Sequence, residues 1–125
     1  MGGLVGNFRN GEIKNSFASG EISGNDKVGG LVGWAKDASI SSSYAVTNMS
    51  SDDIGAGNFG GLLGFATRSN INNSFALVRM NGINIDSGGG LIGFGSDIQI
   101  NNSYAAGDLN IIDSGGIIGI LWRAP

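Results

Sequence analysis

The stretch that decides the fold is Gly2-Gly3-Leu4-Val5-Gly6, because close copies of it recur along the whole chain. The later copies begin at residues 29, 60, 89 and 115, and each has two glycines, two large apolar residues and a third glycine. Repetition at a period of roughly 20 to 50 residues is typical of solenoids, propellers and repeat arrays. The chain is therefore expected to consist of one structural unit used several times.

A second block stands at a constant distance from each double glycine. It reads Ile-x-x-Ser-Phe/Tyr-Ala and begins at residues 13, 40, 71 and 100, eleven positions after the first glycine in every case. A third apolar residue follows nine positions after each isoleucine, and the connector to the next repeat then varies in length. These third apolar positions are Ile22, Met49, Met80 and Leu109.

Each of these apolar blocks has the composition of a short strand, since it is rich in β-branched and aromatic residues and is bounded by Gly, Asn, Asp and Ser. Helical spacing of apolar residues is nowhere sustained. The pattern predicts an all-β fold, a parallel β-solenoid of β-helix type with three short strands per coil and about four and a half coils. Residues 1–125 form one domain, with repeats at 2–28, 29–59, 60–88 and 89–114 and a partial repeat at 115–125.

Stacking of coil on coil predicts columns of like side chains in the interior. One column is isoleucine and the other is aromatic, and aromatic columns gain additional energy from offset stacking. The columns are Ile13, Ile40, Ile71 and Ile100, and Phe17, Tyr44, Phe75 and Tyr104.

Composition excludes several classes of function. The net charge is -3 and the seven basic residues are scattered singly, so nucleic acid is not an expected partner. There is no cysteine, which excludes thiolate and disulfide chemistry. The chain shows no signal peptide and no apolar run of membrane-spanning length, so membrane insertion is not expected. The glycine content, 24 of 125 residues, indicates many tight turns.

The combination of Gly-Gly-Leu-Val-Gly with Ile-x-Asn-Ser-Phe/Tyr-Ala resembles the GLUG motif, a repeat of bacterial surface and secreted proteins that include immunoglobulin A peptidases and large adhesins. The resemblance covers essentially the whole chain. It implies a secreted or cell-surface location for the parent protein, and it transfers no catalytic residue. In one repeat Ser41-Ser42-Ser43 replaces the usual Asn-Ser pair.

Catalytic chemistry has few candidates here, and the chain is not expected to be an enzyme or to hold a cofactor. There is no histidine, so mechanisms that need serine with histidine or histidine with a metal are closed. Polysaccharide-cleaving β-helices need paired carboxylates, but both glutamates, Glu12 and Glu21, lie in the first repeat. Asp37 and Asp97 share one turn position with Arg68 between them, which indicates solvated turn charge.

Two polar columns could form sites. Asp26, Asp53 and Asp113, with Asn84, fall thirteen residues after the isoleucines and could stack as a weak site for a divalent cation, although turn formation is the competing interpretation. The other column contains Asn15, Ser42, Asn73 and Asn102, each followed by a serine. We expect it to form a hydrogen-bonded ladder that satisfies the backbone of a turn, in preference to a recognition strip.

The strongest candidate for a partner surface is a stripe of leucines. Two adjacent positions are apolar in every Gly-Gly-Leu-Val-Gly copy, and in a straight strand they face opposite sides. If the second position points inward, together with Trp34, Phe65 and Phe94 two residues later, the first position faces solvent. If the chain bends at the glycines, both positions turn inward. The predicted interface residues are Leu4, Leu31, Leu62, Leu91 and Ile117, with Trp122 in the apolar C-terminal stretch.

The function expected from these patterns is that of a non-catalytic structural or interaction module, which presents ladders of side chains to a protein partner or to a second copy of itself. The alternative is a carbohydrate-binding or carbohydrate-active β-helix fragment.

Overall fold

The computed structural model describes residues 1–24, 26–51, 56–81, 85–110, 114–115 and 118–122, with side chains described for residues 1–24, 26–51, 57–80 and 88–109. The described chain is all-β, with strands joined by turns and no helix, and every described strand pairs in parallel with its neighbours. Within these residues no helix is long and apolar enough to cross a membrane.

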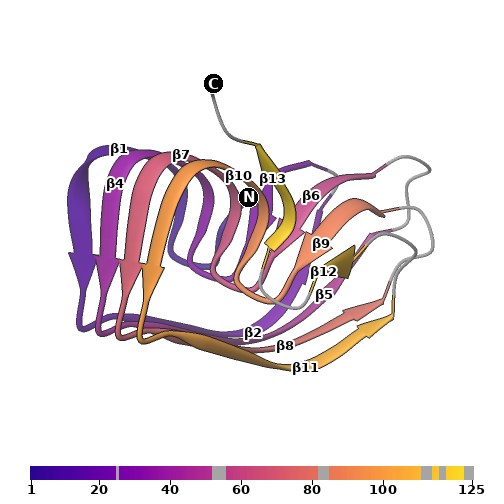
Figure 1. The fold of residues 1–125 in the computed structure, drawn as a ribbon. Coiled ribbons are helices and arrows are strands. Elements are labelled where there is room, and N and C mark those ends of the chain that lie inside the picture. Colours follow the sequence, from indigo (N-terminus) through magenta and orange to yellow (C-terminus); the bar gives the residue numbers. More distant parts are fainter. Residues whose placement is uncertain (25, 52–55, 82–84, 111–113, 116–117, 123–125) are drawn as a thin grey trace.

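Three parallel sheets run along the axis of a solenoid (Figure 1), and each coil contributes one strand to each sheet, apart from the C-terminal strand, which extends the first sheet alone. The first sheet has the order β1 (Val5–Lys14), β4 (Val32–Ser41), β7 (Leu63–Asn72), β10 (Ile92–Asn101) and β13 (Ile118–Trp122). The second has β2 (Phe17–Ser23), β5 (Tyr44–Ser50), β8 (Phe75–Asn81) and β11 (Tyr104–Asn110). The third has β3 (Val28–Gly29), β6 (Ala56–Gly60), β9 (Ile85–Gly89) and β12 (Ser114–Gly115). The predicted parallel solenoid with three strands per coil is confirmed, and the predicted number of coils is slightly too high.

The strands pair in the register that the repeats predict. Ile13 pairs with Ile40, Ile40 with Ile71 and Ile71 with Ile100. Of these side chains the first three are buried, whereas Ile100 is half-buried and packs against the same core. The isoleucine column is therefore interior, as expected.

The strands of the first sheet do not run straight but arch over the interior, as Figure 1 shows. Each full strand of this sheet has one residue with a left-handed backbone near its middle, and another follows at the corner that leads to the second sheet. The two sets are Asn10, Asp37, Arg68 and Asp97, and Asn15, Ser42, Asn73 and Asn102. Asn and Asp tolerate this conformation better than most residues, which explains why they dominate both sets.

A contact between glycine and alanine divides the interior into two compartments. A Cβ atom added to Gly30 would lie 2.6 Å from the Cβ of Ala45, and one added to Gly61 would lie 2.6 Å from the Cβ of Ala76. The double-glycine turn therefore touches the second sheet, and only glycine allows this approach. On one side lies a core that includes Leu31, Val32, Ala35, Ile40, Leu62, Leu63 and Ile71, and on the other a core of Val28, Met49, Phe59, Val78 and Met80.

The prediction of an exposed leucine stripe is wrong, and the alternative, a bend at the glycines that turns both apolar positions inward, is confirmed. Leu31, Leu62 and Leu91 have no exposed surface and belong to the first core. The amides of Leu31 and Val32 both donate to the carbonyl of Leu62, at 2.9 and 3.0 Å. In a straight strand consecutive N–H groups point to opposite sides, so the chain bends here and turns both side chains inward. A leucine with no exposed surface cannot contact a partner.

Of the remaining predicted interface residues, Leu4 alone has a described side chain. Leu4 is 46% exposed on the first coil. Ile117 lies outside the described residues, and Trp122 is described only as the last backbone position of β13.

Candidate interaction surface

The outer face of the second sheet, formed by β2, β5, β8 and β11, carries most of the exposed apolar side chains. Phe17, Val46, Leu77 and Tyr104 are between 41% and 57% exposed, and the other large exposed apolar residues of the described chain, Met1 and Leu4, lie at its N-terminal end. Neighbouring strands pair residue for residue, so outward positions form columns along the solenoid axis. We call this surface the outer face.

The first column of the outer face is an aromatic ladder, made of Phe17, Tyr44, Phe75 and Tyr104. Successive ring centroids are 5.1, 4.9 and 5.1 Å apart, with interplanar angles of 7°, 0° and 5°. The rings cover one another's faces, so the ladder presents ring edges to solvent, with free faces only at its two ends.

The predicted interior position of this aromatic column is wrong. The neighbouring alanines point inward instead, and Ala18, Ala45 and Ala76 are buried in the first core. The compartment is only wide enough for a methyl group there, because the double-glycine turn of the same coil rests on the alanine. An aromatic ring would not fit between the turn and the sheet.

The second column contains Ser19, Val46, Leu77 and Ala106, which occupy the middle of the outer face. Val46 and Leu77 lie on adjacent strands and are each 41% exposed. They line a shallow depression of about 460 Å³ that reaches from β2 to β11. Because Val46 and Leu77 belong to inner coils, their exposure does not come from an unfinished end of the solenoid.

The third column supplies polar and charged groups along the rim of the depression. It consists of Glu21, Asn48, Arg79 and Asp108. Arg79 Nε lies 3.9 Å from Asp108 Oδ2, and both side chains are largely exposed. An ion pair of this kind contributes little to stability and leaves both groups available to other partners. An apolar centre with a charged rim is the usual composition of a protein–protein interface.

The serines at the corner between the first and second sheets form an internal hydrogen-bonded ladder, as predicted. Ser43 Oγ accepts a hydrogen bond from the Ser16 amide at 3.2 Å and donates to the Ser41 carbonyl at 2.8 Å. The same arrangement joins Ser74 to Ser43 and Ser103 to Ser74. Ser43 and Ser74 are 2% exposed, so these hydroxyls satisfy backbone groups and are not accessible to a ligand.

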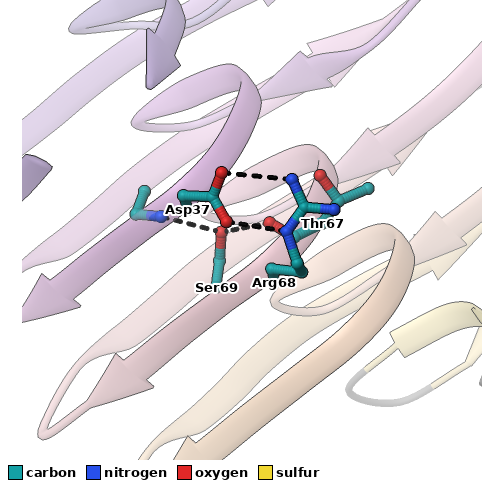
Figure 2. A network of polar contacts seen from close by, with 5 residues as sticks. Asp37, Thr67, Arg68 and Ser69 are labelled. Atoms are coloured by element: carbon teal, nitrogen blue, oxygen red, sulfur yellow. Dashed lines mark hydrogen bonds and ion pairs between the residues drawn. The ribbon is translucent and has the colours of Figure 1, made fainter. Parts of the chain in front are cut away.

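Charged residues at the arch of the first sheet form an exposed ion pair. Figure 2 shows Arg68 bound to Asp37 through two hydrogen bonds, of 2.8 and 3.1 Å. The hydrogen bond from Arg68 is the main reason that the pKa of Asp37 lies below its ordinary value, and the same bond raises the pKa of Arg68. Asp37 therefore remains a carboxylate and has no capacity to act as a general acid near neutral pH.

Three aromatic residues of the first sheet form a second, half-buried ladder. Phe65 stacks on Phe94 with centroids 4.9 Å apart, and Trp34 meets Phe65 edge to face at 6.0 Å. Lys27 Nζ lies 5.5 Å from the Trp34 ring and 5.6 Å from the Phe65 ring. The alternative in which these rings point inward and the leucines face solvent is not the one found, because the rings are half-buried and belong to neither core.

The candidate cation site receives no support from the part that can be described. Asp26 forms an ion pair of 2.9 Å with its neighbour Lys27, and its side chain is 61% exposed. Asp53, Asn84 and Asp113 lie outside the described residues. Among the described residues there is no group of three or more His, Cys, Asp or Glu that could hold a metal ion.

The sequence contained one signal that could have identified the outer face. In the second strand of each coil, Ala18, Ala45, Ala76 and Ala105 recur without variation, whereas the positions on either side change. An invariant small residue next to a large aromatic indicates that the small residue faces the tightest part of a core. Side chains alternate between the two faces of a strand. If the alanine faces the core, the residues on either side of it, which are the aromatic residue and Val46 or Leu77, face solvent.

Comparison with known proteins finds no family model that matches the chain, and no curated protein matches it significantly. The resemblance to the GLUG motif therefore stays a prediction that depends on the repeated residues themselves.

Proposed function

We propose that this chain is a non-catalytic interaction module of a bacterial surface or secreted protein, and that it binds a protein partner on the outer face. The bacterial surface location depends on the resemblance to the GLUG motif. The observation that carries the binding proposal is the exposure of Val46 and Leu77 on adjacent inner coils, beside the aromatic ladder and the charged column. Contiguous exposed apolar surface with a polar rim marks sites of association.

The charged residues support a non-catalytic role because their carboxylates are spread over the surface, and Glu21 and Asp108, which both line the depression, stand three strands apart. Arg68 neutralises Asp37, Lys27 pairs with Asp26, and Lys14 lies 3.3 Å from Glu12. Each pair lies at the surface on a different part of the solenoid, whereas hydrolysis of a glycosidic bond needs two carboxyl groups on opposite sides of one bond.

A protein partner fits the outer face better than a carbohydrate. A sugar ring packs its C–H groups against the face of an aromatic ring, which carries the negative part of the ring quadrupole. In the ladder these faces are covered by the neighbouring rings at 4.9 to 5.1 Å. A protein surface can instead pack side chains into the depression at Leu77 and pair with Arg79 or Asp108 at its rim.

The test is a binding screen of the chain against two panels, one of purified extracellular proteins and one of purified bacterial and host polysaccharides. A variant with Val46→Ser and Leu77→Ser is screened in parallel, with Asn70→Ala, on an exposed position of the first sheet, as the matched control. We expect at least one protein whose affinity falls by about 10-fold or more in the double variant and is unchanged in the control, as for loss of a central contact. A protein that binds both variants equally, or a polysaccharide that depends on Val46 and Leu77, would contradict the proposal.

A further inference from the structure

The two ends of the solenoid carry complementary sets of unused hydrogen-bonding groups. In the serine ladder the amide of each serine donates to the hydroxyl of the serine one coil further on, at 3.2 Å in all three steps. At the last step Ser103 is the acceptor, and its own amide has no partner among the described residues. At the first step Ser16 is the donor, and its hydroxyl accepts no hydrogen bond from a described residue.

The backbone beside the ladder shows the same complementarity. The amides of Tyr44, Phe75 and Tyr104 donate to the carbonyls of the serines in the preceding coil. Phe17 is the equivalent residue of the first coil, so its amide points away from β5 and has no preceding coil of the described chain to donate to. Ser103 is the equivalent serine of the last coil, so its carbonyl is the next acceptor in the series. The amides of Asn15, Ser42 and Asn73 likewise donate to carbonyls in the following coil, which leaves the Asn102 amide as the next donor.

The aromatic side chains at the two ends also match, although the same register places Asp108 opposite Glu21 of a second copy, a pair of like charges that weakens the contact. Phe17 and Tyr104 are the end members of the aromatic ladder and are 57% and 56% exposed, whereas Tyr44 and Phe75 are half-buried between neighbours. Each end member has one ring face uncovered. A small apolar opening of about 170 Å³ lies at the last coil, lined by Gly90, Ala105, Gly107 and Leu109 among others.

We propose that residues 98–101 and β11 pair with residues 11–14 and β2 of a second copy of this chain, so that copies join head to tail. The Ser103 amide then donates to Ser16 Oγ of the second copy, and the Asn102 amide donates to its Lys14 carbonyl. The Phe17 amide of the second copy donates to the Ser103 carbonyl, and its ring stacks on Tyr104. Unpaired strand edges at matching register are a template for such pairing. This contact lies at the two ends of the solenoid, shares with the outer face only its terminal strands and the terminal rings Phe17 and Tyr104, and does not depend on the proposed function.

One strand limits the strength of this association. β13 pairs with residues 92–96 of β10, in the register that residues 5–9 of a second copy would adopt. The two segments compete for one edge, and β13 has the advantage of belonging to the same chain. Joining the copies therefore requires β13 or residues 5–9 of the second copy to leave the sheet. We expect association to be concentration-dependent, and open-ended because the contact joins two different surfaces.

The test uses sedimentation velocity with three variants of the full chain. Phe17→Lys blocks one end of the ladder and Tyr104→Lys the other, and both residues are exposed enough for the fold to persist. Val46→Lys, on the outer face, is the matched control. We expect the unmodified chain and Val46→Lys to form species larger than a dimer as concentration rises. Each end variant alone should remain monomeric at concentrations about 10-fold higher.

The decisive sample is an equal mixture of the two end variants. Only a head-to-tail contact leaves one intact end on each, so the mixture should form a 1:1 heterodimer and nothing larger. An unmodified chain that stays monomeric at all accessible concentrations, or a mixture that stays monomeric, would overturn the proposal. So would loss of assembly in Val46→Lys, which would place self-association on the outer face. If Phe17→Lys fails to fold, Ser16→Ala replaces it at the same end of the solenoid, since that hydroxyl makes only one exposed bond, to the Lys14 carbonyl. If Tyr104→Lys fails to fold, Tyr104→Ser replaces it, because it removes the stacking ring at the other end without adding a charge.

Discussion

The contact between the double-glycine turn and the second sheet should make Gly61 almost impossible to replace. A Cβ atom at this position would overlap the Gly90 carbonyl oxygen and would lie 2.6 Å from the Cβ of Ala76. The first neighbour is backbone and cannot rotate away, so the change Gly61→Ala forces two coils apart. Overpacking of a core costs about 1–3 kcal/mol, and a clash with backbone places this variant at or above about 3 kcal/mol.

Thermal unfolding followed by circular dichroism measures the effect. For a domain of this size about 3 kcal/mol corresponds to a fall in Tm of about 10 °C or more, and total stabilities of about 5–15 kcal/mol leave room for complete unfolding. The control is Gly6→Ala in the first repeat, where an added Cβ meets no atom within 4 Å. That variant should melt within about 2 °C of the unmodified chain, since open surface positions change stability by less than about 0.5 kcal/mol. A Gly61→Ala variant that melts together with Gly6→Ala would refute the two-compartment interior.

Three further changes test other parts of the structure. Ser43→Ala removes a buried hydroxyl that satisfies one amide and one carbonyl, so it should lower the free energy of unfolding by about 1–3 kcal/mol in urea titrations; a neutral result would contradict the serine ladder. Thr47→Val should raise the free energy of unfolding by about 1 kcal/mol, because Thr47 Oγ1 is buried with no partner among the described residues. Valine fits this position, since Val78 pairs with Thr47 from the next coil. Destabilisation would show that the hydroxyl is bonded. Because Arg68 lowers the pKa of Asp37, the pair stabilises the fold above the ordinary pKa of Asp37 and loses this contribution as the pH falls through the lowered value. Asp37→Asn should therefore reduce stability slightly at pH 7, and its difference from the unmodified chain should shrink as the pH falls in the acid range; a difference that does not change with pH would exclude the ion pair as the cause.

The repeat pattern was sufficient to predict the solenoid and the register of its strands. Period and register are properties of spacing, and the constant distance from the double glycine to Ile13, Ile40 and Ile71 specifies both. The serine ladder could also be predicted, because a small polar residue that recurs at every corner has a backbone to satisfy.

The orientation of the columns could not be predicted from the alternation rule alone. That rule assumes a straight strand, but two consecutive amides, those of Leu31 and Val32, share one carbonyl acceptor and bend the chain. The error at Leu31 and Leu62 follows from this bend. The error at Phe17 and Tyr104 has another cause, since large rings were assumed to fill the interior, whereas the narrow contact at the glycine turn admits only alanine.

The proposed binding surface depends on both corrections. If the leucines had faced solvent, a partner would have been expected on the first sheet. Because they form the core, the exposed apolar side chains of inner coils are those of the outer face, Val46 and Leu77. The arrangement of these side chains predicts the chemistry of the partner. Its binding surface should have apolar groups at the centre and charges at the edge.

Hydroxyl-radical footprinting of the free chain is the most direct test of the central claim. That claim is that the aromatic ladder of the second sheet faces solvent, whereas Met49 and Met80 of the same sheet face inward. Met49 and Met80 are 1% and 0% exposed, whereas Phe17 and Tyr104 are more than half exposed. Methionine is intrinsically among the most readily oxidised side chains, so its protection in the presence of oxidised Phe17 and Tyr104 is the result that we predict. Rapid oxidation of Met49 and Met80, with Phe17, Tyr44, Phe75 and Tyr104 protected, would contradict the orientation of the second sheet and with it the binding surface.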